Sequence, residues 1–196
     1  MKNIPNILSA IRMVLAPVFL FMYLQDELVW RSLSIAVFAT AAVTDYFDGK
    51  IARHYKIESE LGVFIDPLAD KFLTFAGFIC LPFLDATQFP WWAVAIILGR
   101  DLVITAFRLM ARKRKLPMKT RVTAKVKTLV QMAFLYTVLL LGVFIESDIE
   151  FANQANTFFN SGKLYYVMIF VTFLTLYSGI EYLVINRKVL SFGANE

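Results

Sequence analysis

The chain has 196 residues, of which 59% are hydrophobic, and its formal net charge is +5. A soluble domain of this composition would expose a large apolar surface to water, so the composition predicts an integral membrane protein. The single cysteine, Cys80, excludes an intramolecular disulfide bond and a cysteine-based metal site. The first apolar stretch lacks a basic leading region and a small-residue cleavage site, so no cleavable signal peptide is expected.

Six apolar stretches of bilayer length follow one another, and each predicts one membrane-spanning helix. They cover residues 7–25, 30–48, 61–84, 90–110, 123–145 and 163–186. Helix-breaking residues lie between these stretches or at their edges: Gly49, the region from Pro82 to Pro90, Pro117, and residues 153–162. No repeat or soluble extension is visible. The sequence therefore predicts one all-α domain over residues 1–196, a membrane-embedded bundle of six transmembrane helices.

Charged residues in the connections orient this bundle. Basic residues gather before the first helix, after the second and fourth, and after the sixth; they include Lys2, Arg12, Lys50, Arg53, Lys56, Arg112, Lys113, Arg114, Lys115, Lys119, Arg121, Arg187 and Lys188. Acidic residues dominate the alternate connections, and only Arg31 and Lys163 oppose the trend. Because basic connections remain in the cytoplasm, both termini and the second connection are predicted to be cytoplasmic, in the cell (inner) membrane.

Four aspartates flank that second connection: Asp45, Asp48, Asp66 and Asp70. The first two are three residues apart and the last two are four apart, so each pair shares one helix face. A hairpin of the second and third helices would bring the pairs together. Four carboxylates near a membrane cannot all remain charged and unpaired. Oxygen ligands suit Mg²⁺ or Mn²⁺, so the pattern predicts a metal site with more than one ion.

The same residues read D-x-x-D-G-x-x-A-R, eight further residues, then G-x-x-x-D-x-x-x-D. This pattern resembles the signature of the CDP-alcohol phosphotransferases, six-helix membrane enzymes that displace CMP from a CDP-linked alcohol. The resemblance implies that Asp45 and Asp66 bridge two metal ions. Asp48 would bind one ion and Asp70 the other, and Asp70 would also be the general base.

The resemblance also assigns a donor site. Gly49, Arg53 and Ser59 would contact the CDP moiety of CDP-diacylglycerol, and Asn6 and Ser9 would line the nucleotide pocket from the first helix. A guanidinium such as that of Arg53 offers a forked donor to a phosphate. The family further implies a homodimer, and no nucleic acid is expected as a partner.

Two later stretches concern the acceptor alcohol. The segments G-R-D-L-V-I-T-A-F-R and A-K-V-K-T-L-V-Q-M are similar to those of phosphatidylglycerophosphate synthases, in which R-E-x₆-L-R and G-K-x-K-T-x₂-Q are typical. Asp101 stands where Glu is usual, and Ala124 where Gly is usual.

The cations of these segments suit an acceptor with its own phosphate, such as sn-glycerol 3-phosphate. We expect Arg108 and Lys125 to hold that phosphate, with Arg112 and Lys127 assisting. Snorkelling at the interface is the alternative for Arg108 and Lys125, and the positive-inside effect is the alternative for the run that begins at Arg112.

Other functions remain open at this point. Within the family, the alternatives are a cardiolipin, phosphatidylserine or phosphatidylinositol-type synthase. From another class, intramembrane aspartates could serve a divalent-cation or proton-coupled transporter, although transport favours carboxylates at mid-membrane on broken helices. A lipid-binding scaffold without catalysis would not need both aspartate pairs.

Overall fold

The computed structural model describes residues 4–55, 62–114, 116–119, 121–147 and 151–187, with side chains described at 10–41, 71–114, 116–119, 121–147 and 152–187. Within these ranges the chain is built from helices, without a strand, which confirms the all-α prediction. The six long helices are α1 (Ile4–Tyr23), α2 (Leu28–Tyr55), α3 (Gly62–Leu84), α4 (Trp91–Lys113), α5 (Val122–Ile145) and α7 (Lys163–Ile185). A short helix, α6 (Phe151–Phe159), lies between α5 and α7.

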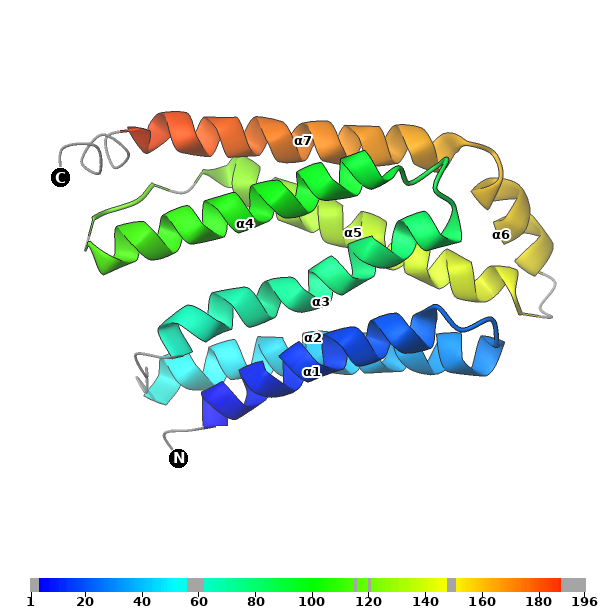
Figure 1. Ribbon diagram of the computed structural model, residues 1–196, viewed down its shortest axis with the longest axis horizontal. Coiled ribbons are helices and arrows are strands. Elements are labelled where there is room, and N and C mark those ends of the chain that lie inside the picture. The colour runs from blue at the N-terminus through cyan, green and yellow to red at the C-terminus, as the bar shows by residue number, and fades with distance from the viewer. Residues whose placement is uncertain (1–3, 56–61, 115, 120, 148–150, 188–196) are drawn as a thin grey trace.

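The long helices run back and forth along one axis (Figure 1). α1 packs against both α2 and α3, while α7 packs against α4 and α5. α3 contacts α4 and α5 and so joins the two groups. The N-terminal end of α1, the C-terminal end of α7 and the facing ends of α2 and α3 all lie at one end of the bundle, and α6 lies at the other (Figure 1).

Two predicted helix breaks are wrong. α2 continues through Gly49 to Tyr55, so Asp45 and Asp48 do not end the helix. One interior glycine costs a helix only about 1 kcal/mol, which the rest of a 28-residue helix outweighs. Residues 153–159 form most of α6 instead of a break, although Gly162, with a φ of 73°, does interrupt the chain just before α7.

α6 packs against the bundle through one apolar face. Ala155 and Phe159 are four residues apart and both are buried. The Phe159 ring lies 6.0 Å from that of Phe89. On the exposed face, the Thr157 hydroxyl donates to the Asn153 carbonyl at 2.8 Å. The polar residues that suggested a break therefore occupy the outer face of a packed helix.

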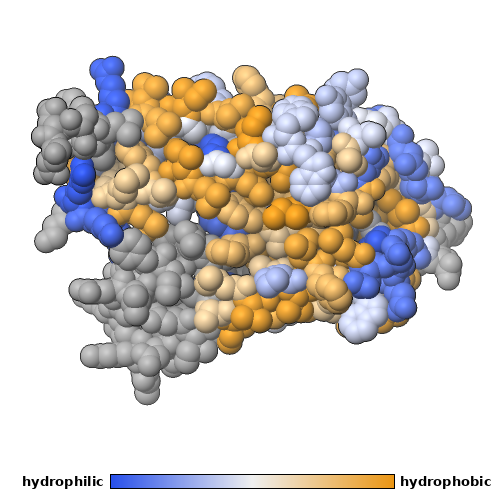
Figure 2. Space-filling model, viewed as in Figure 1, coloured by the Kyte–Doolittle hydropathy of each residue, from blue (hydrophilic) through white to orange (hydrophobic). Residues whose placement is uncertain are grey.

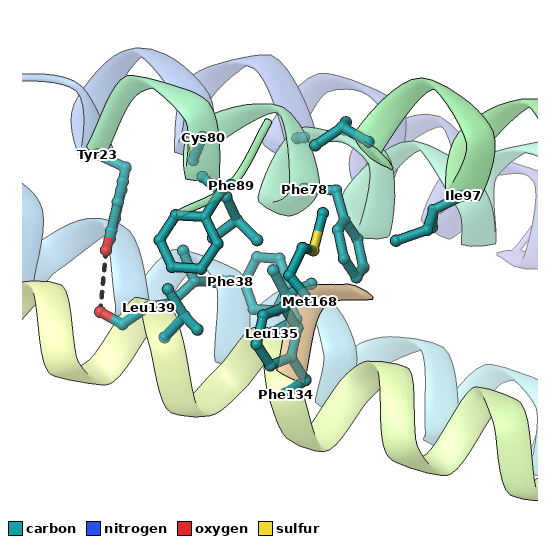
Figure 3. Close-up of a cluster of buried hydrophobic side chains, with 14 of the residues drawn as sticks. Tyr23, Phe38, Phe78, Cys80, Phe89, Ile97, Phe134, Leu135, Leu139 and Met168 are labelled. Atoms are coloured by element: carbon teal, nitrogen blue, oxygen red, sulfur yellow. Dashed lines mark hydrogen bonds between the residues drawn. The ribbon is translucent and has the colours of Figure 1, made fainter. Parts of the chain in front are cut away.

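The core is rich in aromatic rings and lies between the two groups of helices (Figure 3). Phe78 of α3, Phe134 of α5 and Met168 of α7 are among its buried members, and Cys80 is fully buried there too. The Tyr23 hydroxyl donates to the Leu139 carbonyl at 3.0 Å, which ties α1 to α5 (Figure 3).

Apolar side chains also cover much of the outer surface. Figure 2 shows them along the middle of one face, with hydrophilic side chains at both ends. Within the described side chains, α5 and α7 are each long and apolar enough to cross a membrane. The described apolar parts of α1, α2 and α3 are shorter: Ala10–Tyr23, Leu28–Ala41 and Lys71–Leu84. α4 differs from its neighbours because Arg100, Asp101 and Arg108 interrupt its apolar sequence.

Candidate functional site

The four predicted metal ligands occupy adjacent helices. Asp45 and Asp48 lie ten and seven residues before the end of α2, and Asp66 and Asp70 lie four and eight residues after the start of α3. At 1.5 Å per residue, these positions are roughly 6–15 Å from the helix ends that face residues 56–61. Because α2 and α3 are antiparallel and contact each other, the backbone places both pairs at a similar level.

The side chains of these aspartates lie outside the described residues. Among the side chains that the structure does describe, no group of three or more His, Cys, Asp or Glu could hold a metal ion. Of the predicted donor-binding residues, Asn6 and Ser9 lie on α1 and Gly49 and Arg53 on α2, again without described side chains. Ser59 lies outside the described residues.

Arg108 and Lys125 line one groove between α4 and α5, which we call the α4–α5 groove. Its volume is about 670 Å³. The remaining lining residues are largely apolar and come from α5: Ala124, Thr128, Leu129, Met132 and Ala133. The groove thus brings together the two cations that the sequence assigns to the acceptor phosphate.

A ring on α7 holds the Arg108 side chain in place. Its Nε donates to the Tyr182 hydroxyl at 3.1 Å, and its guanidinium lies 5.0 Å from the centre of the Tyr182 ring. A cation above an aromatic face is attracted to it. The Nη atoms remain available to a ligand in the groove, since the described contacts engage only Nε and the guanidinium face. Arg112, one turn further along α4, is exposed and is not among the groove's lining residues.

Lys127 lies apart from the groove. Its side chain is 2% exposed, and its Nζ lies 2.5 Å from Oδ1 of Asp101, which is equally buried. The reason is helical geometry: residues two apart point to different faces. When Lys125 faces the groove, Lys127 therefore faces the bundle interior.

Asp101 is the centre of a buried group of charges, the Asp101 cluster, formed by Lys71, Arg100, Asp101 and Lys127. Besides Lys127, the Asp101 carboxylate meets Nη1 of Arg100 at 2.9 Å and Nζ of Lys71 at 3.6 Å. Arg100 also donates from Nη2 to the Ser178 hydroxyl at 2.9 Å. The cluster therefore connects α3, α4, α5 and α7.

Close helix packing shapes the cluster. A Cβ atom on Gly179 of α7 would lie 2.9 Å from Cγ of Arg100, so the glycine makes room for the arginine stem. Within the part of the chain that the structure describes, Nε of Arg100 is buried without a hydrogen-bond partner, as are both amide atoms of Gln131 on α5. Gln131 lies four residues after Lys127, on the same face of the helix.

The sequence alone did not reveal this cluster. Lys71, Arg100 and Asp101 have no predicted role, and Lys127 is predicted only to assist at the phosphate. The available signal is the position of Asp101 and Lys127 on otherwise apolar helices, where burial of a charge requires a partner.

Comparison with known proteins gives a consistent result. The sequence pattern of the family described as CDP-alcohol phosphatidyltransferase matches residues 2–177. A Rickettsia typhi protein named CDP-diacylglycerol–glycerol-3-phosphate 3-phosphatidyltransferase is 32% identical over 142 residues, which are 72% of this chain and 78% of that protein. A Cereibacter sphaeroides protein of the same name is 33% identical over 158 residues, 79% of this chain and 71% of its own.

A third relative aligns over a shorter range. The Mycobacterium tuberculosis H37Rv protein named "Probable phosphatidylglycerophosphate synthase" is 41% identical over 115 residues. This alignment spans only about half of each chain, 57% of this one and 54% of the mycobacterial one. The family pattern, in contrast, extends over nearly all of the described helices. The chain therefore belongs to the CDP-alcohol phosphatidyltransferase family.

Proposed function

We propose that the protein transfers the phosphatidyl group from CDP-diacylglycerol to sn-glycerol 3-phosphate, giving phosphatidylglycerophosphate and CMP. Membership of the family supports the CMP-releasing transfer, and the names of the relatives from Rickettsia typhi and Cereibacter sphaeroides support this acceptor. The observation that carries the choice of acceptor is the meeting of Arg108 and Lys125 at one groove. Two cations that line one groove suit an acceptor that brings its own phosphate.

The aspartate pairs fit a pair of Mg²⁺ or Mn²⁺ ions. Four carboxylates provide the hard oxygen ligands that these cations prefer, and the α2–α3 hairpin places both pairs at a similar level. Asp45 and Asp66 would each contact both ions, with Asp48 and Asp70 completing the site. When bound, such ions neutralise a pyrophosphate and polarise its phosphorus.

Protein side chains would carry the remaining steps. Asp70 takes the proton from the 1-hydroxyl of glycerol 3-phosphate as its oxygen bonds to the β-phosphorus of CDP-diacylglycerol. The bond from that phosphorus to the bridging oxygen breaks, and CMP leaves with the electron pair. Arg53 and Gly49 contact the CDP moiety, as do Ser59 and, from α1, Asn6 and Ser9. Arg108 and Lys125 hold the acceptor phosphate, with Arg112 one turn further along α4. Lys127, which is paired with Asp101 away from the groove, would assist only indirectly.

We place this site at the cytoplasmic face of the cell (inner) membrane. The six long helices would each cross the bilayer, and the apolar surface in Figure 2 would face lipid. Both chain ends and the α2–α3 connection then lie in the cytoplasm, where the basic residues concentrate. The acyl chains of the donor would enter laterally from the bilayer. We expect the enzyme to act as a homodimer, as its family resemblance implies.

An acceptor panel tests the function. Purified protein is incubated with CDP-diacylglycerol and, in turn, glycerol 3-phosphate, glycerol, serine, inositol and phosphatidylglycerol; CMP release and the lipid product are measured. Glycerol 3-phosphate should give phosphatidylglycerophosphate, and the unphosphorylated alcohols should react poorly. Preferential formation of cardiolipin, phosphatidylserine or phosphatidylinositol would identify another member of the family. If none of the alcohols tested gave CMP release, the transferase assignment would be wrong.

A further inference from the structure

We propose that Asp101 is a positioning residue for the transfer: through Lys71 and Lys127 it fixes α3, α4 and α5 relative to one another at the site. The inference rests on the proposed function, because it concerns the residues assigned there to acceptor and metal. Asp101 itself is buried and would not touch a substrate.

The location of the Asp101 cluster supports this role. Each of its three helices carries a residue of the proposed site close to its cluster member. Lys71 directly follows Asp70 on α3, Lys127 lies two residues after Lys125 on α5, and Asp101 lies two helical turns before Arg108 on α4. One carboxylate therefore joins the helix of the proposed base to the two helices that supply the phosphate ligands.

Stability alone does not account for such a cluster. Burying an ion pair costs free energy because both charges are removed from water. Apolar residues of similar volume often stabilise a fold as well or better. The Asp101–Lys127 pair nevertheless lies in an apolar bundle, with both side chains 2% exposed. Its geometry is also specific: the Asp101 carboxylate accepts from Lys127 of α5 and is paired with Lys71 of α3, which restricts how α3, α4 and α5 can slide past one another.

The charge of the cluster is a second observation. Among the described side chains, one carboxylate faces three cations, so this part of the bundle has more positive than negative charge. Lys71 is its most exposed member, with 29% of its side chain accessible. Nε of Arg100 and the amide of Gln131 also have no hydrogen-bond partner among the described residues. An interior with surplus positive charge and unused donors favours an anionic substrate on the helices around it.

Four variants separate positioning from plain structural support. Asp101→Asn leaves Lys127 buried without its closest counter-charge, so it should lower both thermal stability and turnover. Lys127→Gln should likewise lower turnover. The double variant Asp101→Asn with Lys127→Gln removes both charges and should regain stability. If Asp101 positions the site, the kcat/KM of the double variant for glycerol 3-phosphate stays roughly 10- to 100-fold below that of the wild-type protein. Asp101→Glu keeps the carboxylate and should retain most activity.

Glu181→Gln is the matched control. Glu181 of α7 also joins two helices, since it accepts from Thr123 and pairs with Arg121 at the start of α5. Because it lies outside the cluster, its loss should lower stability with little change in kcat/KM at a temperature where the protein is folded. For Asp101→Asn and the double variant we expect the KM for glycerol 3-phosphate to rise or kcat to fall, while the KM for CDP-diacylglycerol changes little.

Two outcomes would overturn the inference. A double variant with wild-type activity would show that the pair only balances charge, and a double variant that does not fold would show that the fold itself requires it. The acceptor panel on the wild-type protein keeps this test separate from the proposed function. If another alcohol proves to be the acceptor, that function is wrong, and the Asp101 variants are then measured with the accepted alcohol.

Discussion

Arg31, near the start of α2, forms an ion pair with Glu146, the residue that follows α5. The Arg31 guanidinium also lies 5.5 Å from the centre of the Tyr23 ring, and its Nε donates to the Tyr23 carbonyl at 3.2 Å. Arg31 is one of two basic residues that oppose the charge pattern of the connections. Its charge is balanced within the protein, which explains how an arginine is accommodated at the end predicted to lie outside the cytoplasm.

Arg31→Ala should therefore destabilise the protein. The change removes the ion pair and leaves the Glu146 carboxylate, 29% exposed, without its partner. We expect a loss of about 1–3 kcal/mol, since an unsatisfied, partly buried acceptor costs about that much. Thermal unfolding in detergent measures it. Lys163→Ala, at the other exceptional basic residue, should change stability by less than about 0.5 kcal/mol; equal losses would contradict a specific role for Arg31.

Glycine substitutions test the packing around Tyr23. A Cβ atom on Gly142 would collide with the Tyr23 hydroxyl, which is buried and bonded to Leu139. Gly142→Ala should thus cost about 1–3 kcal/mol through overpacking. Gly99→Ala is the control, because nothing lies within 4 Å of its added Cβ, and it should stabilise α4 by up to about 1 kcal/mol. Equal unfolding temperatures for the two variants would show that Tyr23 can move aside.

Metal dependence tests the aspartate pairs. Activity should require Mg²⁺ or Mn²⁺, disappear with a chelator and return when metal is added. Asp45→Asn and Asp66→Asn should each lose nearly all turnover in folded protein, because each residue is proposed to contact both ions. CMP release and circular dichroism measure activity and folding. Robust activity in chelator-treated protein would exclude the two-ion proposal.

Arg53 and Arg108 should affect different substrates. Arg53→Ala should mainly raise the KM for CDP-diacylglycerol, and Arg108→Ala the KM for glycerol 3-phosphate. Loss of one charge-assisted hydrogen bond is worth roughly 1.5–3 kcal/mol, about 10- to 150-fold. Lys125→Ala should resemble Arg108→Ala, and the double variant should be less than additive because both residues hold one phosphate. If Arg53→Ala and Arg108→Ala raised the KM of the same substrate, the acceptor assignment would be wrong.

The long helices could be predicted from sequence because apolar length sets them directly. All six lie within a few residues of their predicted bounds except at the end of α2, where the sequence predicts a helix end at Gly49 and the helix continues to Tyr55. α6 was missed because its packing face consists of only a few apolar residues among polar ones. That face is buried only because it packs against Phe89, which lies far away in the sequence.

Part of the candidate site could likewise be predicted from the sequence, and part could not. The aspartate motif could be recognised from residue spacing alone. The grouping of Lys125 with Lys127 could not be resolved, because the sequence shows two cations two residues apart but not which one faces inward. The answer depends on Asp101, 26 residues away on another helix. Tertiary packing, rather than local pattern, decides which lysine reaches the groove.

The hydrogen bond from Tyr23 to Leu139 has a consequence for biosynthesis. Its two residues are 116 positions apart, and ribosomes add about 5–20 residues per second. Tyr23 is thus added to the chain roughly 6 to 23 seconds before Leu139, the residue that accepts its hydrogen bond. During that interval the main contacts of α1 and α2 can form only between these two helices and with α3, because α5 is still incomplete. Closure of the bundle is therefore a late event in translation, and the early helices remain an incomplete unit until α5 is made.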